Sequence, residues 1–143
     1  MRFEIPDHKR LVHELQIPLR WSDMDAMQHV NNATYFSYLE IARVDWFRTI
    51  DIVPDLNGDG PVVANAFCNF AKQLEYPGTV RAKLYVANPG RASFDTYTTF
   101  ERSDSPGVIH AVGGATVVWV NYREKKSKPL PDWFSSLLAN PSN

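Results

Sequence analysis

The sequence predicts an α+β fold in which an antiparallel sheet of about five strands wraps around one long helix. A stretch without glycine or proline, residues 32–50, is long enough for a single helix. Apolar segments of strand length follow it and are separated by turn sequences. With 143 residues, 44% of them hydrophobic and 22% charged, the chain fits one domain over residues 1–143.

The helix is predicted from its apolar spacing. Tyr35, Leu39, Ala42 and Trp46 recur at the interval of one helical face, and Phe36, Phe47 and Ile50 widen that face. A helix of this length spans about 28 Å at about 1.5 Å per residue. Because apolar residues occupy much of its circumference, we expect other elements to surround it.

The strands are predicted from apolar runs and from the turns between them. Residues 80–86 alternate apolar with polar positions, which indicates one buried face. The turn sequences at 88–90 and 103–107 predict that the last three strands form an antiparallel meander. The expected strands cover residues 11–20, 62–73, 79–87, 91–102 and 108–121, and a short helix is expected over 131–139.

Composition narrows the classes of function. A formal charge of -1 offers no general attraction to nucleic acid or to an anionic membrane, and no apolar run is long enough to cross a bilayer as a helix. The single cysteine, Cys68, has no intrachain partner for a disulfide, and the first ten residues lack the apolar core of a secretory signal. We therefore expect a cytoplasmic protein that uses no metal and no redox cofactor.

Two carboxylates and a histidine directly precede the predicted helix, in the segment DMDAMQHVNN at residues 23–32. A helix N-terminus offers unpaired N–H groups and a partial positive charge, which can stabilise an oxyanion. A nearby carboxylate can attack a carbonyl or activate a water. The same residue types are also common helix caps, so this pattern alone leaves both interpretations open.

The longer stretch RWSDMDAMQHVNNATYFSYLEIAR, residues 20–43, resembles the motif of the hotdog-fold acyl-CoA thioesterases of the 4-hydroxybenzoyl-CoA thioesterase type. It contains Asp-x-Asp, His-Val-Asn-Asn, a tyrosine and Glu-x-x-Arg in the family's order. The resemblance implies a hotdog fold and hydrolysis of an acyl-CoA to a free acid and coenzyme A. The His-Val-Asn-Asn run is closest to members that act on fatty acyl chains, which favours a medium or long aliphatic chain.

The resemblance also assigns roles to residues. Asp25 matches the catalytic aspartate, as nucleophile or general base, and Asn32 matches the position whose backbone N–H polarises the thioester carbonyl. His29 and Asn31 either contact the substrate or fix and cap the loop. Tyr35 and Phe70 are expected to line the acyl tunnel or the core.

Glu40 and Arg43 lie three residues apart on the predicted helix. We expect them to pair with each other or to brace the Asp25 loop, and an ordinary surface salt bridge is the alternative.

Further substrate contacts are expected outside this motif. Asn65 lies in an apolar strand and either lines the pocket or pairs within the sheet. Arg91 is one of several basic residues that could bind the phosphates of coenzyme A, although a solvated edge also explains it. Met27 stands where the plant acyl-carrier-protein thioesterases have asparagine, so His29 is not assigned as a general base.

The resemblance implies a homodimer or homotetramer whose active sites lie between subunits. Two other functions remain open from the sequence. One is a hydratase or dehydratase that acts on an acyl thioester on the same scaffold, and the other is a non-catalytic acyl-thioester-binding protein. The sequence also leaves open whether coenzyme A or acyl carrier protein carries the acyl group.

Overall fold

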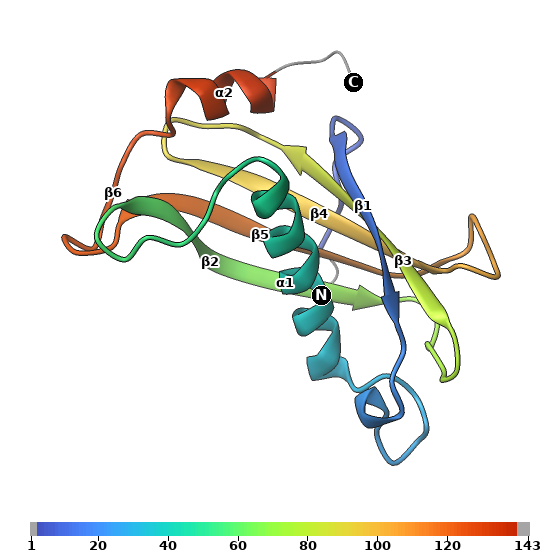
Figure 1. Ribbon diagram of the computed structural model, residues 1–143. Helices are drawn as coiled ribbons and strands as arrows, with labels where there is room; N and C mark the ends of the chain where they lie inside the picture. Colours follow the sequence, from blue (N-terminus) through green and yellow to red (C-terminus); the bar gives the residue numbers. More distant parts are fainter. Residues whose placement is uncertain (1–2, 140–143) are drawn as a thin grey trace.

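The computed structural model describes residues 3–139, in which a curved sheet lies against one long helix and a short helix covers one end (Figure 1). In chain order the elements are β1 (Arg10–Pro18), the 3-10 turn η1 (Trp21–Asp23), α1 (Asn32–Thr49), β2 (Asp59–Phe70), β3 (Thr79–Ala87), β4 (Ser93–Arg102), β5 (Ile109–Asn121), β6 (Lys126–Ser127) and α2 (Asp132–Ala139).

The sheet has the strand order β1-β3-β4-β5-β2, and β6 pairs with the end of β5. Every neighbouring pair is antiparallel. β1 and β2 therefore form opposite edges although they are consecutive strands in the chain. α1 lies between them in sequence and crosses the inner face of the sheet, with its start at one end of the strands (Figure 1).

Close packing fixes α1 against the middle of the sheet. A Cβ added to Gly113 on β5 would lie 2.6 Å from a methyl group of Leu39, so the helix approaches the strand where no side chain intervenes. Around the first half of α1, Leu39 packs with Tyr35, Val80 and Phe100 in one buried cluster. This packing places the start of α1 over the ends of the strands.

A second buried cluster surrounds the other half of α1. Trp46 packs there with Phe94 and with Phe134 of α2, whose ring also lies 5.6 Å from that of Trp119. α2 therefore closes the end of the sheet that lies away from the start of α1 (Figure 1). The loop before α1 is left open at the other end.

The structure confirms the predicted fold. Residues 79–121 form the predicted antiparallel meander, and Val80, Ala82, Leu84 and Val86 are the buried positions of β3. Two details differ from the prediction. The short strand β6 is additional, and Phe36, expected on the buried face of the helix, is 40% exposed.

No helix among residues 3–139 is long and apolar enough to cross a membrane. Within the same described range, no three histidine, cysteine or carboxylate side chains are grouped so as to hold a metal ion.

Candidate active site

The loop before α1 is held by its own backbone and by the segment that follows β2. The Asp25 N–H donates to the His29 carbonyl at 2.9 Å, and the Gln28 N–H donates to the Asp25 carbonyl at 2.9 Å. Gln28 takes a positive φ of 64° to make this turn. The Val30 N–H donates to the Leu74 carbonyl, which attaches the loop to the segment after β2.

The Asp25 side chain uses one of its two oxygens within the loop. Oδ1 accepts the N–H of Met27 at 2.9 Å and a longer contact from the N–H of His29 at 3.5 Å. Among the described residues, the other oxygen accepts no hydrogen bond. One half of the carboxylate is thus oriented by the backbone, and the other half is available in an exposed position.

The first backbone N–H groups of α1 differ in whether they have a hydrogen-bond acceptor. Asn31 is the N-cap, and its side-chain oxygen accepts the N–H of Ala33 at 2.9 Å. The Thr34 N–H donates to the Asn31 carbonyl, and the Asn31 N–H donates to the carbonyl of Asp23. Within residues 3–139, the N–H of Asn32 has no acceptor. This amide carries the helix's positive end and is free to bind an incoming oxygen.

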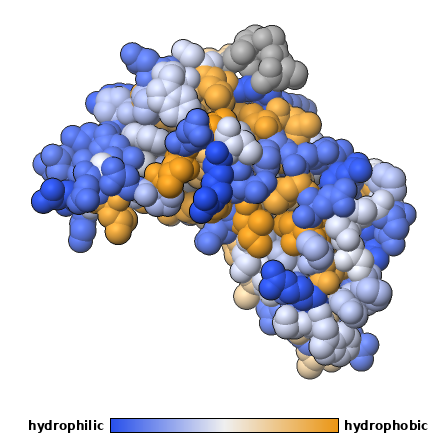
Figure 2. All heavy atoms as spheres, in the orientation of Figure 1, coloured by the Kyte–Doolittle hydropathy of each residue, from blue (hydrophilic) through white to orange (hydrophobic). Residues whose placement is uncertain are grey.

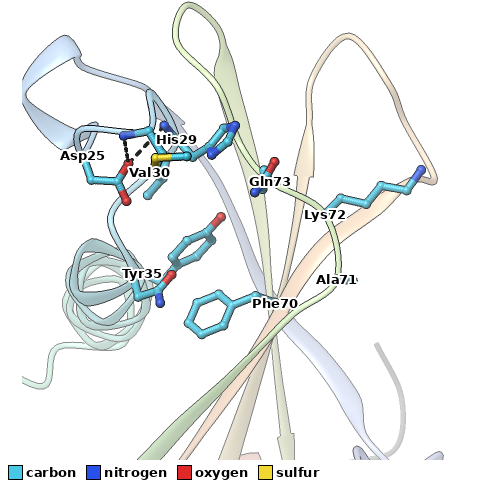
Figure 3. Close-up of a pocket in the computed structure, with 10 residues that line it drawn as sticks. Asp25, His29, Val30, Tyr35, Phe70, Ala71, Lys72 and Gln73 are labelled. Carbon is cyan, nitrogen blue, oxygen red and sulfur yellow. Dashed lines mark hydrogen bonds between the residues drawn. The ribbon is translucent and has the colours of Figure 1, made fainter.

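Asp25 and Asn32 line the same pocket, which has a volume of about 650 Å³. The pocket lies between the loop, the start of α1 and the end of β2, where the rings of Tyr35 and Phe70 pack edge to face with centroids 4.9 Å apart (Figure 3). Its ten lining residues are Asp25, Met27, His29, Val30, Asn32, Tyr35, Phe70, Ala71, Lys72 and Gln73. Polar groups and apolar side chains in one pocket match a substrate with a reactive carbonyl and an apolar chain.

Asp23 has a different role from Asp25. Its carboxylate accepts the hydroxyl of Tyr38 at 2.8 Å and the N–H of Arg20 at 3.1 Å. Burial, followed by this contact with the carboxylate, raises the pKa of Tyr38 above its usual range. Asp23 therefore connects the loop to α1, and unlike Asp25 it does not line the pocket.

Comparison with known proteins identifies the family. The sequence profile of the thioesterase-like superfamily matches residues 19–138. This chain belongs to that superfamily. A structure from Pseudomonas aeruginosa, named as a candidate thioesterase, is 36% identical, with a TM-score of 0.85 over 91% of this chain and 100% of that chain. The predicted family is confirmed, and the comparison supports the predicted thioester hydrolase.

Two further solved structures and one curated protein are similar to this chain. A candidate acyl-CoA thioesterase from Xanthomonas campestris is 32% identical, with a TM-score of 0.76 over 85% of this chain and all of that chain. A 1,4-dihydroxy-2-naphthoyl-CoA thioesterase from Synechocystis, at 13% identity and a TM-score of 0.81 over 91% of this chain and 97% of that chain, shows the shared fold. The curated Bacillus subtilis protein YsmA is 29% identical over 59 residues, which are 41% of this chain and 40% of YsmA.

Three of the predicted contact residues of this superfamily member lie around the loop. His29 lines the pocket, and its Nε2 lies 3.4 Å from a carboxylate oxygen of Glu75. Tyr35 is buried in the pocket wall, and this burial is the main cause that raises its pKa to about 12. Asn31 caps α1 and does not line the pocket, so contact with substrate stays a prediction for it.

The other two predicted contact residues lie outside the pocket of this subunit. Asn65 is exposed on β2, away from Asp25. Arg91 is exposed in the turn after β3, where its carbonyl accepts the N–H of Leu130, at the end of the sheet near α2 (Figure 1). Their substrate contacts therefore also stay predictions.

Of the second wall of the pocket, the sequence indicated only Phe70, as a residue of the acyl tunnel or the core. Phe70, Ala71, Lys72 and Gln73 form this wall because the Ala71 and Lys72 amides both donate to the carbonyl of His110, at 2.9 Å each. This shared acceptor ends the regular pairing of β2 and turns the chain toward the loop. No local sequence signal identifies such a contact between distant strands.

Proposed function

We propose that this protein is an acyl-CoA thioesterase that hydrolyses a medium or long-chain fatty acyl-CoA to the free acid and coenzyme A. The observation that carries the proposal is the free N–H of Asn32 beside the half-free carboxylate of Asp25 in one pocket. The thioester carbonyl oxygen binds the Asn32 N–H, where the helix dipole stabilises the developing negative charge.

Asp25 supplies the second part of the reaction. Its free oxygen either attacks the thioester carbon directly or removes a proton from a water that attacks it. The carbon–sulfur bond breaks, coenzyme A leaves as the thiol, and water supplies the oxygen and the protons of the two products. The apolar side chains of Tyr35 and Phe70 favour an aliphatic acyl chain deeper in the pocket.

We further propose that the protein works as a homodimer or homotetramer, in the cytoplasm and in fatty acid metabolism. The support for assembly is the β2 edge, where Val62, Val63, Ala64, Asn65 and Ala66 are all exposed. A long apolar edge strand with unpaired backbone groups favours pairing with another strand.

The decisive assay measures thiol release from a panel of acyl-CoAs of increasing chain length. We expect hydrolysis that is fastest for medium or long aliphatic chains, without added metal. A hydratase would instead consume an enoyl-CoA without releasing thiol, and a binding protein would release none from any substrate. Absence of thiol release across the panel would refute the proposed function.

Asp25→Asn tests the catalytic assignment in the same assay. The amide keeps an oxygen for the Met27 N–H but is a poor nucleophile and base, so kcat should fall by about 100-fold or more while the fold persists. Circular dichroism would verify the fold. Turnover near that of the wild type would exclude Asp25 as the catalytic carboxylate.

A further inference from the structure

Arg43 is an unusual residue of α1. It is only 9% exposed, and burial lowers the pKa of its guanidinium. Glu40 was expected to pair with it or to brace the loop, but no carboxylate among residues 3–139 lies within ion-pairing distance of Arg43. Glu40 attracts the guanidinium, but among the described residues Arg43 makes no side-chain hydrogen bond, so an acceptor from outside this subunit would complete its environment.

Arg43 lines a second pocket, of about 250 Å³, that is separate from the pocket of Asp25. Val44 and Phe47 of α1 and Val62 and Val63 of β2 belong to its apolar wall, and Glu40 and Arg48 of α1 also line it. Figure 2 shows apolar side chains over α1 and beside the hollow next to it. The guanidinium is thus presented in a mainly apolar recess that opens beside the β2 edge.

The β2 edge indicates what covers this recess. Residues 62–71 contain neither a charged side chain nor a proline, although charges and prolines are the usual means by which edge strands avoid pairing. Val63 is 44% exposed, and Phe36 and Val44 of the neighbouring helix are exposed as well. An uncharged edge flanked by exposed apolar residues fits a second copy of the same strand.

Twofold symmetry then determines which pockets meet. An isologous antiparallel pairing places the start of one β2 beside the end of the other. The Arg43 pocket lies at the start of β2, at residues 61–63, and the Asp25 pocket lies at its end, at residues 70–73. Pairing about the middle of the strand therefore brings the Arg43 pocket of one subunit next to the Asp25 pocket of its partner.

We propose that each active site is composite, with Asp25 and Asn32 from one subunit and Arg43 from the other. In this arrangement the Arg43 guanidinium binds a carbonyl oxygen of the acyl-pantetheine part of the substrate. Thioester and amide carbonyls are neutral acceptors that a guanidinium can bind within an apolar wall. The assignment rests on the proposed thioesterase function and adds a substrate-binding residue to it.

Arg43→Gln should raise the KM for acyl-CoA by about tenfold or more, the scale of a lost hydrogen bond to a charged group, with a smaller effect on kcat. Arg43→Lys keeps the charge and should recover part of the affinity. Arg123→Gln is the matched control because Arg123 is exposed in the turn after β5 and lines neither pocket. An unchanged KM for Arg43→Gln would overturn the proposal.

Heterodimers purified through two different tags distinguish a contribution in trans from one in cis. In a dimer of one Asp25→Asn subunit and one Arg43→Gln subunit, a composite arrangement leaves one site with both native residues. Its kcat/KM should be about half that of the wild type, because two equivalent sites are expected per dimer. A contribution in cis leaves no intact site, and kcat/KM would be about one twentieth, which would overturn the proposal.

The matched heterodimer carries both substitutions in one subunit and none in the other. Its composition is the same, but the expectation is reversed: about one twentieth of wild-type kcat/KM in trans and about half in cis. Sedimentation and circular dichroism of each purified dimer verify assembly and folding. If the wild type releases no thiol, the proposed function fails; if it does and the two heterodimers follow the cis pattern, only the Arg43 assignment fails.

Discussion

At the scale of single residues, the two acids of the Asp-x-Asp pair differ in what surrounds their carboxylates. Asp23 accepts the hydroxyl of Tyr38 on α1 and lies outside the pocket lining, whereas Asp25 lines the pocket and makes no contact with α1 through its side chain. The sequence placed both acids in the same loop but could not show these contacts, because Tyr38 reaches Asp23 only once α1 has formed.

Asp23→Asn should therefore lower stability more than turnover. The amide replaces a charged acceptor of the partly buried Tyr38 hydroxyl, which should cost about 1–2 kcal/mol in the free energy of unfolding. Urea denaturation measures this loss, with Asp25→Asn as the control of nearly unchanged stability. A purely kinetic loss larger than that of Asp25→Asn would mean that the roles of the two acids are reversed.

The rate at which the Cys68 thiol is alkylated should depend on pH. Burial raises the pKa of its thiol to about 12, above the ordinary value of 9.0. Because only the thiolate is alkylated readily, the native thiol should react with iodoacetamide far more slowly at pH 8 than a free cysteine does, and the rate should keep rising with pH up to about 12. Unfolding in guanidinium should restore ordinary reactivity. Rapid alkylation of the native protein at pH 8 would contradict the buried placement of this side chain.

At the scale of elements, the position of α1 depends on one glycine of β5. Gly113→Ala would place a methyl group 2.6 Å from the Leu39 side chain, so the helix must shift or the side chain must repack. We expect a loss of about 1–3 kcal/mol in the free energy of unfolding. Gly90→Ala is the control, since its nearest neighbour would lie at an ordinary 3.5 Å and its stability should change by less than about 0.5 kcal/mol.

The elements themselves were largely predictable because their signals are local. The stretch without glycine or proline predicted α1. The alternation of apolar and polar residues around Leu84 predicted the buried face of β3. The exposure of Phe36 and the burial of Arg43 were not predictable. Both depend on how α1 lies over the sheet, and helical spacing alone places Phe36 with the buried residues.

The residues of the candidate site were also predictable only where their signal is local in the sequence. Asp25 and Asn32 were predicted because one short segment contains both the loop and the helix start. Phe70 was predicted only as a residue of the tunnel or the core, and its neighbours Ala71, Lys72 and Gln73 were not predicted. The pocket wall depends on the pairing of β2 with β5 some forty positions further along the chain, where Phe70 lies opposite Ala111. Sequence spacing carries little information about contacts of that range.

At the scale of the whole molecule, the proposed dimer makes both assembly and activity depend on the β2 edge. Ala64 lies in the middle of β2, is exposed, and sits at the irregularity between Val63 and Asn65 in the pairing with β5. Ala64→Lys would bring two like charges together near the twofold axis of a dimer, on a strand that otherwise carries no charge from residue 60 to residue 71. Pairing of the two edges should then be strongly disfavoured.

We expect the wild type to sediment as a dimer or larger assembly and Ala64→Lys to sediment as a monomer. Because each site would then lack its second subunit, activity should fall by about tenfold or more although Asp25 is untouched. Ser136→Lys, which adds the same charge on the exposed face of α2, should change neither assembly nor activity. A monomer with full activity at the concentration of the assay would show that one subunit is sufficient, since no part of the site would then depend on the β2 edge.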